Sequence, residues 1–253
     1  MTYGIDAPRS FRNFGVGSVL AIAAGVALLT MGGPWRVVGA ICLLGGLTLA
    51  FLSVSIVWGS LVGKIRLRDR LLAAIPWRGD ERVLDVGCGR GLMLIGAAGR
   101  LTSGKAIGID IWRDEDQSRN SRQAVLSNAA AQGVGDRVEV LDADARAIPF
   151  ADESFDVVLS SFVIHNLAQA ADRATALGQI VRVLKPGGRA VIIDILKGRE
   201  YAAFLRGLGL DVTLGPWKLM FALPTRVVTA TKRTIQVKPL TNSPPCLTGS
   251  PIV

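Results

Sequence analysis

Hydrophobic residues are distributed very unevenly along the chain. No residue is charged from Asn13 to Trp35, and none is charged from Val37 to Gly63. Each run reaches roughly the 20 residues with which a helix crosses about 30 Å of hydrocarbon. The pattern predicts two transmembrane helices, over about residues 14–33 and 37–60, joined by a tight turn.

Two other interpretations of this region remain open. The first run could be a cleaved signal peptide, but its apolar stretch exceeds the usual length of about 7–15 residues and a second run follows at once. The two runs could also form a buried hairpin of a soluble domain. We favour a membrane hairpin for the length of the first run and the second run behind it. The glycines inside both runs suit close contact between helices in lipid, although glycine is also common in membrane helices in general.

The flanking charges predict the orientation of the hairpin. Arg9 and Arg12 precede the first run, a basic cluster over residues 64–70 follows the second, and only Arg36 lies in the turn. The positive-inside rule then assigns both ends to the cytoplasm. We therefore expect a multi-pass protein of the cell membrane whose N-terminus and remaining chain are cytoplasmic.

Beyond residue 80 the pattern alternates between strand-like and helix-like segments. This alternation predicts an α/β fold: a Rossmann-like, mostly parallel sheet of about seven strands with helices on both faces. We divide the chain into a membrane hairpin (1–65), a soluble domain (66–232) and a disordered tail rich in proline and serine (233–253). Ser121 should cap one helix and Gly133 should end it. The expected strands cover 82–86, 105–110, 137–141, 155–160, 189–195, 211–215 and 226–231, and the expected helices 92–100, 121–132, 172–184 and 200–208.

Composition adds little to this prediction. The net charge is +9, but the basic residues are mostly scattered and no nucleic-acid recognition motif accompanies them. The basic cluster at 64–70 adjoins the expected membrane, where anionic lipid is the nearer partner. We therefore expect a lipid bilayer as a partner and no nucleic acid. Cys42, Cys88 and Cys246 show no paired spacing, which indicates neither a disulfide framework nor a zinc site.

The motif most suggestive of chemistry is VLDVGCGRGL, residues 83–92. Asp85 is followed by glycines at every second position and then by a predicted helix. Ligands of such sheets bind at the carboxyl ends of the strands, where glycines let the backbone come close. The spacing is G-x-G-x-G, and Leu92 stands where a dinucleotide fingerprint would have its third glycine or an alanine.

This stretch resembles the first motif of class I S-adenosylmethionine-dependent methyltransferases, in which an acid precedes G-x-G-x-G. Later segments resemble the same family in order: AIGID, which ends at Asp110, DARAIPFADESFDVV, which begins at Asp144, and VLKPGGRAVIIDI. The likeness covers roughly residues 80–232 and is closest to the branch that modifies small molecules, quinones and lipids. The hairpin is not part of the common pattern.

The resemblance implies S-adenosylmethionine as cofactor. It implies that Asp110 takes both ribose hydroxyls, and that Asp144 and the next amide hold the adenine. A carboxylate at Asp85 complements the sulfonium and ammonium charges, although each aspartate alone could be a helix cap or a solvated loop acid. The residues expected to bind the cofactor are Asp85, Gly87, Cys88, Gly89, Gly91, Asp110, Ile111, Asp144, Ala145 and Ser160.

A catalytic base is needed only if the acceptor is a protonated hydroxyl or amine. His165 is the only histidine, and it follows the fourth expected strand at the expected mouth of the pocket. It is our candidate base, and the alternative is a packing histidine bound to a backbone carbonyl. Asn166, Ser160 and Ser161 are weaker candidates for lining the pocket.

Residues 111–120 depart from the family pattern. Trp112 could lie against the adenine, and Asp114, Glu115 and Asp116 could form a solvated turn. Adjacent carboxylates point in different directions and no histidine joins them, so we expect no metal.

The sequence thus predicts a membrane-anchored, cytoplasm-facing S-adenosylmethionine-dependent methyltransferase acting on a small-molecule or lipid-like apolar acceptor. A nicotinamide-dependent oxidoreductase is disfavoured by Leu92 and by the lack of a Tyr-x-x-x-Lys pair. A non-catalytic, cofactor-binding scaffold protein on the membrane is the other alternative.

Overall fold

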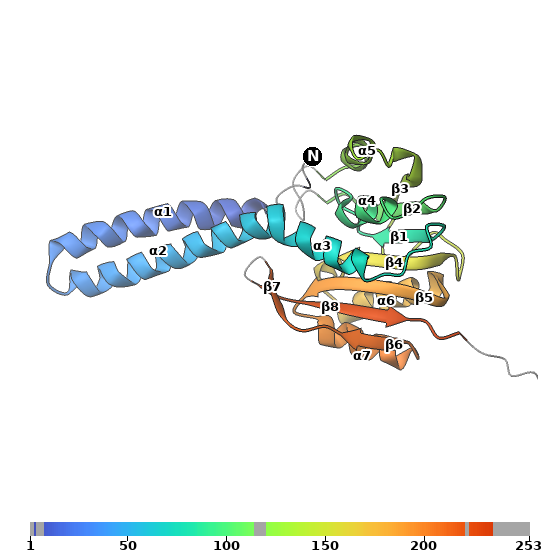
Figure 1. The fold of residues 1–253 in the computed structure, drawn as a ribbon. Coiled ribbons are helices and arrows are strands. Elements are labelled where there is room, and N and C mark those ends of the chain that lie inside the picture. The colour runs from blue at the N-terminus through green and yellow to red at the C-terminus, as the bar shows by residue number, and fades with distance from the viewer. Residues whose placement is uncertain (1–2, 4–7, 114–119, 221–222, 235–253) are drawn as a thin grey trace, which may run out of the picture.

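The computed structural model describes residues 3, 8–113, 120–220 and 223–234, and it consists of a long helical hairpin that projects from an α/β domain (Figure 1). Helix α1 spans Pro8–Met31 and helix α2 spans Trp35–Trp58. The second helix continues through a π-helical turn, Gly59–Gly63, into α3, Lys64–Ala73. The predicted tail beyond residue 234 and most of the 111–120 segment lie outside the described residues.

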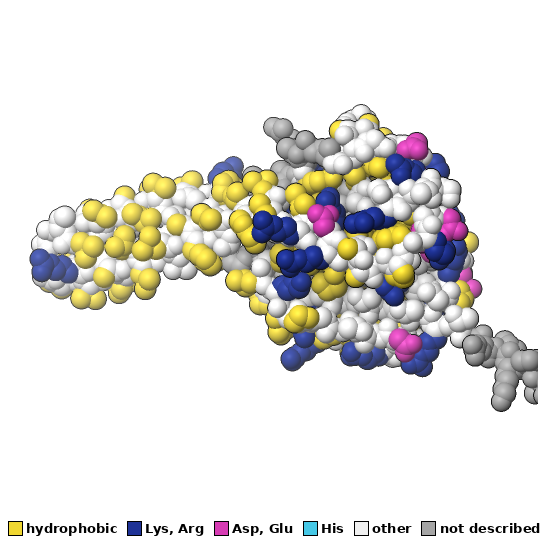
Figure 2. All heavy atoms as spheres, viewed as in Figure 1, with side chains coloured by type: hydrophobic (Ala, Val, Ile, Leu, Met, Phe, Trp, Pro, Cys, Tyr) yellow, Lys and Arg dark blue, Asp and Glu magenta, His cyan; other side chains and the backbone are white. Residues whose placement is uncertain are grey.

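The hairpin helices are long and apolar enough to cross a membrane. In the part of the chain that the structure describes, two segments meet this criterion, Arg9–Met31 with a mean hydropathy of 2.1 and Trp35–Ala73 with 2.3. Most of their side chains are not covered by the rest of the protein: Leu44, for example, is 68% exposed. Figure 2 shows hydrophobic side chains along this face of the hairpin and basic ones at its ends. This exposure disfavours a hairpin buried in a soluble core.

Glycines allow the two helices to pack closely. A Cβ atom on Gly25 would lie 2.7 Å from the Leu43 backbone nitrogen, and one on Gly39 would lie 2.8 Å from that of Leu29. Both distances are shorter than a carbon atom can tolerate against backbone, so these positions require glycine. Gly45, in contrast, faces open space.

The long helix does not end near residue 60, where the hydrophobic run suggested. It carries on into α3, which packs on α4 (Leu92–Ala98) and buries Leu67 and Leu72 in the domain core. The basic cluster is therefore amphipathic: Lys64 is buried, whereas Arg66 and Arg70 are exposed. The sequence predicted a domain boundary between residues 65 and 66, but the helix runs through both without a break. That boundary therefore stays a prediction.

The domain is built on an eight-stranded sheet with the order β3-β2-β1-β4-β5-β8-β6, and β7 pairs with β8. The first five strands are parallel, and β8 runs antiparallel to β5, β6 and β7. The predicted Rossmann-like α/β fold class is confirmed. The strands are β1 (Arg82–Val86), β2 (Lys105–Asp110), β3 (Val138–Asp142), β4 (Phe155–Ser161), β5 (Leu184–Ile195), β6 (Asp211–Leu214), β7 (Lys218–Met220) and β8 (Leu223–Thr231). The remaining helices are α5 (Arg122–Ala131), α6 (Ala170–Val183) and α7 (Gly198–Gly207), with short 3-10 turns at Gly135–Arg137 and Ile164–Asn166.

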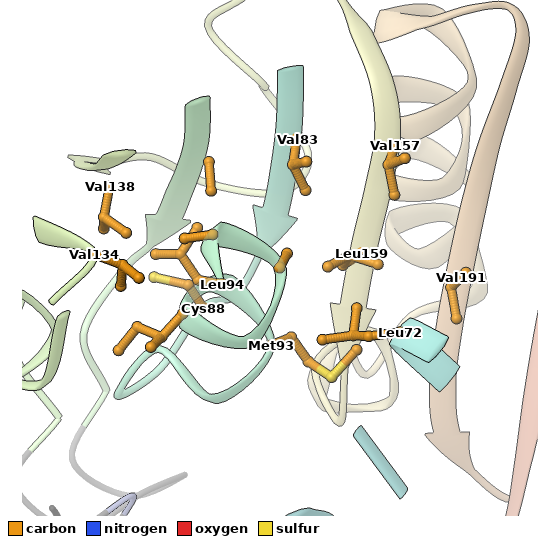
Figure 3. Packing of buried hydrophobic residues seen from close by; sticks show 14 of the residues in the cluster. Leu72, Val83, Cys88, Met93, Leu94, Val134, Val138, Val157, Leu159 and Val191 are labelled. Carbon is orange, nitrogen blue, oxygen red and sulfur yellow. The ribbon is translucent and has the colours of Figure 1, made fainter. Parts of the chain in front are cut away.

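Helices cover both faces of the sheet because the central strands are apolar on both sides. In β1, Val83 belongs to the core beneath α3, α4 and α5, whereas Leu84 belongs to the core beneath α6 and α7. Figure 3 shows the first of these cores, where Leu72 of α3 and Met93 of α4 lie close to strands β4 and β5. The helix that leaves the hairpin is therefore part of the domain core.

Within the domain, most element boundaries agree with the sequence pattern to within about two residues, but β5 and β8 begin earlier than expected. Ser121 caps α5 by accepting a hydrogen bond from the Ala124 N–H, as predicted, and Gly133 adopts a positive φ of 66° just beyond the helix. Strand β5 begins at Leu184 rather than at residue 189, because Leu184 pairs with Phe155 across an irregular register. Strand β7 was not predicted, since three residues are too few to show a periodicity.

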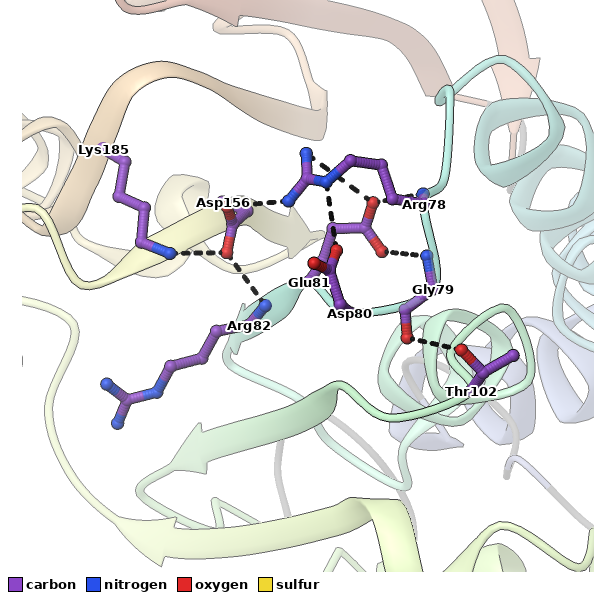
Figure 4. Close-up of polar contacts among 8 residues, drawn as sticks. All are labelled: Arg78, Gly79, Asp80, Glu81, Arg82, Thr102, Asp156 and Lys185. Carbon is purple, nitrogen blue, oxygen red and sulfur yellow. Dashed lines mark hydrogen bonds and ion pairs between the residues drawn. The ribbon is translucent and has the colours of Figure 1, made fainter.

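A polar cluster fastens the amino ends of the central strands (Figure 4). The Asp156 carboxylate accepts hydrogen bonds from the Arg82 N–H at 3.0 Å and the Lys185 ammonium at 2.8 Å, and it is paired with Arg78. The buried Glu81 carboxylate accepts from the Gly79 N–H at 2.9 Å. The cluster lies at the amino ends of the strands, whereas the glycine motif lies at their carboxyl ends. We therefore assign the cluster a structural role.

Candidate functional site

The glycine motif forms the loop between β1 and α4, where the sheet order turns from β1 towards β2 on one side and β4 on the other. Gly87, Gly89 and Gly91 all have positive φ angles, of 71°, 52° and 84°. A Cβ atom on Gly87 would also lie 2.3 Å from the Val163 side chain. The loop therefore needs glycine both for its backbone conformation and for close packing.

The amide groups of the loop are used within the protein. The Gly87 and Cys88 N–H groups donate to the Ile109 carbonyl, at 2.8 and 3.0 Å, and the Gly89 N–H donates to Asp110 Oδ2 at 2.8 Å. A phosphate cradle needs several N–H groups aimed at the ligand. With these three donors occupied, the loop is suited to close approach of a ligand rather than to binding a phosphate.

The two carboxylate oxygens of Asp85 differ in their hydrogen bonding. Its Oδ2 accepts a hydrogen bond from the Leu94 N–H at 2.9 Å and so caps α4, whose N-cap residue is a glycine without a side chain. Its Oδ1 is buried and has no hydrogen-bond partner among the described residues, although Asp85 lines the pocket described below. Burial, and secondarily the nearby charge of Asp110, raises the pKa of this carboxyl to about 7, against the lowering effect of the Leu94 hydrogen bond.

Asp110 ends β2 and joins the glycine loop to the chain that follows. Its Oδ1 accepts from the Trp112 N–H at 2.7 Å and from the Asn120 side-chain amide at 3.4 Å. The Trp112 indole donates instead to Asp142 at 2.6 Å, and Trp112 is not among the pocket-lining residues. The expectation that Trp112 stacks on an adenine therefore has no support in this arrangement.

Asp144 and Ala145 lie at the pocket as the family resemblance implied. The Asp144 carboxylate is already engaged by Arg146, whose backbone N–H and guanidinium both donate to it, the latter at 2.6 Å. The hydrogen bond from the Arg146 side chain lowers the pKa of Asp144. Asp144 is therefore held as an anion at the rim of the pocket.

His165 lies in the short turn after β4 and is held by a buried carboxylate from β5. Its Nδ1 lies 2.5 Å from Asp194 Oδ1, and its backbone N–H donates to Asp194 Oδ2 at 3.0 Å. Asp194 also accepts from the Ile195 N–H and the Tyr201 hydroxyl. A carboxylate that only accepts fixes the proton of the imidazole on Nδ1, which leaves Nε2 with a lone pair. The Nδ1 atom of His165 thus contacts a side chain, whereas the alternative of a packing histidine expected a contact with a backbone carbonyl.

These residues surround one cavity of about 310 Å³ at the carboxyl ends of β1, β2 and β4. Most predicted site residues line it, but Gly91 and Ser160 do not: Gly91 begins α4, and Ser160 is buried while its neighbour Ser161 faces the pocket. The predicted residues that line it are Asp85, Gly87, Cys88, Gly89, Asp110, Ile111, Asp144, Ala145, Ser161, His165 and Asn166.

Several pocket residues were not found from the sequence. Ile56 and Lys64 come from the long helix, Leu223 from β8, and Asn120 from the start of α5. Asp194, which supports His165 from behind, had a recognisable signal, because it is a charged residue inside an otherwise apolar buried strand. Among the described residues no group of three histidine, cysteine or acidic side chains could hold a metal ion.

Comparison with known proteins identifies the domain. Residues 84–192 match the model of the family described as "Methyltransferase domain". The 27-O-demethylrifamycin SV methyltransferase of Amycolatopsis mediterranei is 37% identical over 131 residues, which cover 52% of this chain and 44% of that protein. The ubiquinone/menaquinone biosynthesis C-methyltransferase UbiE of Geobacter sulfurreducens is 36% identical over 136 residues, covering 53% and 50%. This chain thus spans about half the length of these relatives.

Solved structures agree at the level of the fold. A SAM-dependent methyltransferase from Aquifex aeolicus superimposes with a TM-score of 0.52 and 23% identity, over 65% of this chain and 88% of the other. The family match and the relatives confirm the resemblance inferred from the glycine motif and the later segments, and the solved structure supports the fold.

Proposed function

Residues 84–192 form a methyltransferase domain, and from this premise we propose that the protein is a membrane-anchored S-adenosylmethionine-dependent methyltransferase that acts on a small apolar or lipid-like acceptor. Helices α1 and α2 are its anchor, and its N-terminus and domain are cytoplasmic. One observation carries the proposal. The pocket that contains the glycine loop and two buried or half-buried aspartates is also lined by Ile56 and Lys64 of the apolar hairpin helix and its extension.

The residues of the pocket fit the cofactor. The unpartnered Oδ1 of Asp85 suits a ligand that carries positive charge, and a phosphate there would be repelled. Asp110 would accept the two ribose hydroxyls, and Asp144 with the Ala145 amide would hold the adenine, with Ile111 as a further candidate. When bound, S-adenosylmethionine supplies a methyl group already activated by a sulfonium sulfur. The protein has to align an acceptor atom with that methyl group and exclude water.

The acceptor side of the pocket is apolar. Phe162, Val163, Leu167, Ile195 and Leu223 line it together with Ile56. Such walls favour a hydrophobic ring or chain over a charged metabolite. The relative named for ubiquinone and menaquinone biosynthesis supports an acceptor of this class.

His165 removes the proton of a hydroxyl or amine acceptor. Asp194 orients the ring and fixes its tautomer, so that Nε2 receives the proton. The developing positive charge on the imidazole is stabilised by the same carboxylate, whose other hydrogen bonds hold it in place.

The geometry of the hairpin supports an anchor. Trp35 and Trp58, about half exposed, begin and end α2, and 23 helical steps of about 1.5 Å separate them by about 35 Å. Tryptophan is enriched at both membrane interfaces, and this spacing suits a bilayer. The Lys64 ammonium donates to the Tyr3 carbonyl at 3.0 Å, so the start of the chain lies beside the domain. This contact supports both ends of the hairpin lying on one side of the membrane, in agreement with the charge distribution.

One experiment tests the activity directly. Purified full-length protein in lipid vesicles is incubated with S-adenosylmethionine that carries a labelled methyl group and with a total membrane lipid extract. We expect label in the organic phase, and we expect Asp110→Ala to abolish it at low cofactor concentration. Calorimetric binding of S-adenosylmethionine without any transfer would favour the scaffold alternative, and binding of NADH instead would favour an oxidoreductase.

A further inference from the structure

A patch of exposed apolar side chains lies on the domain where the hairpin meets it. Leu196 follows β5, and Trp217, Leu219 and Leu223 come from the segments around β7 and β8. The four are 57, 48, 65 and 40% exposed, in that order. Leu219 pairs with Pro224, which follows Leu223, and the Leu196 N–H donates to the Pro224 carbonyl, so these residues are neighbours. Isolated apolar residues are common on protein surfaces, but a contiguous group marks an interaction site. We call these four residues the hairpin-side patch.

Strand β7, which carries Leu219 of the patch, contacts the long helix. Met220 of β7 is buried, and a Cβ atom on Gly63 would lie 3.5 Å from its sulfur, so β7 packs directly on the turn between α2 and α3. On the helix next to this contact, Trp58 and Leu61 are 53 and 54% exposed. Figure 1 shows β7 beside the same turn.

Basic side chains accompany the patch. The Arg226 Cζ atom lies 4.6 Å from the centre of the Trp217 ring. Lys218, the next residue after Trp217, is half-buried, and Arg199 is exposed on α7. Figure 2 shows further Lys and Arg side chains over α3, where the hairpin joins the domain. Aromatic and aliphatic groups with cations around them match the boundary between acyl chains and anionic headgroups.

We propose that the hairpin-side patch is a second membrane contact, which enters the interface of the bilayer that holds α1 and α2. This inference rests on the proposed membrane anchor and goes beyond it. Leu223 belongs both to the patch and to the pocket lining, and Ile56 and Lys64 line the pocket from the helix side. The contact therefore turns the mouth of the pocket towards the lipid, and an apolar acceptor enters sideways from the bilayer.

The test uses the full chain with the photoreactive residue benzoylphenylalanine at one position at a time. The protein is reconstituted in vesicles of phosphatidylcholine and phosphatidylglycerol (3:1) that contain a radiolabelled phospholipid, and lipid adducts are counted after illumination. The probe replaces Leu219 in the patch, Leu44 in the middle of α2, or Leu208. Leu208 is 48% exposed but lies between α7 and β6, near the amino ends of the parallel strands and so at the other end of β8 from β7. We expect strong labelling at Leu44, and labelling at Leu219 at least fivefold above that at Leu208.

The outcomes separate this inference from the proposed function. Labelling at Leu44 with Leu219 no higher than Leu208 would overturn the second contact and leave the anchor intact. Absence of labelling at Leu44 would overturn the anchor, and with it this inference. Two charge-reversal variants add a second readout. Lys218→Glu should lower labelling at position 219 at least twofold in the anionic vesicles. Arg100→Glu, on an exposed residue beyond α4, should leave it unchanged.

Discussion

The protonation of Asp85 should couple cofactor binding to pH. Its carboxyl is buried, with a pKa raised to about 7 chiefly by burial, and its Oδ1 has no partner among the described residues. In the cofactor-free protein at pH 7, about half of the molecules therefore carry a proton on Asp85. If the cationic cofactor binds only the ionised form, binding must expel that proton.

The size of the effect follows from this value. With a pKa of about 7, the ionised fraction is about one eleventh at pH 6 and about ten elevenths at pH 8. The dissociation constant for S-adenosylmethionine should then be about tenfold higher at pH 6 than at pH 8, or about 1.4 kcal/mol. About half a proton should be released per cofactor bound at pH 7, and about 0.9 at pH 6.

Isothermal titration calorimetry in buffers of different ionisation enthalpy measures both quantities. Asp85→Asn is the matched control, because the amide keeps an oxygen for the Leu94 N–H but does not titrate. The α-amino group of the cofactor titrates near pH 8 in both proteins and cancels in the comparison. If the wild-type affinity changed by less than twofold from pH 6 to 8 relative to the variant, the cofactor would not contact the Asp85 charge.

The same pKa makes a stability prediction of defined sign. The folded state holds the Asp85 proton up to about pH 7, whereas the unfolded chain loses it near pH 4, so stability falls as pH rises between these values. The full loss relative to Asp85→Asn approaches about 4 kcal/mol, at about 1.4 kcal/mol per pH unit. Asp144 and Asp211 have lowered pKa values, so their contributions are lost only as pH falls below about 4. Thermal unfolding of the cofactor-free protein and of Asp85→Asn in detergent at pH 4.5 to 7.5 measures this difference.

Further substitutions test the remaining parts of the site and its support. Asp110→Ala should weaken cofactor binding by about 1–3 kcal/mol, because the ribose loses a charged acceptor, and a calorimetric change below twofold would refute that role. Gly89→Val should abolish binding, since a branched side chain at a φ of 52° would strain the loop and fill the ligand space; intact affinity would disprove the loop assignment. Leu72→Ala should lower the free energy of unfolding by about 2–5 kcal/mol, measured by denaturant titration, if α3 is part of the domain core. His165→Ala and Asp194→Asn should both reduce labelled methyl transfer by about 10²-fold or more with cofactor affinity unchanged, whereas an equal loss of affinity would make the histidine a packing residue.

The sequence alone determined the scaffold and the position of the glycine loop within it. The strands were recognisable because buried strands of a parallel sheet are continuous apolar runs. The motif from Asp85 to Leu92 is contiguous, so its residues necessarily form one loop, and the order of the later segments placed Asp110 and Asp144 at the ends of neighbouring strands. The hairpin was likewise visible, since length and apolarity are properties of a local segment.

Tertiary structure decided what lies opposite that loop. His165 and Asp194 are 29 residues apart, and only the pairing of β4 with β5 brings them together. Lys64 belongs to a basic run that pattern alone assigned to the headgroups, yet the continuous helix turns its side chain into the pocket. Ser160 and Ser161 differ by one position, and because successive side chains of a strand point to opposite faces, only the register of β4 determined which serine reaches the pocket.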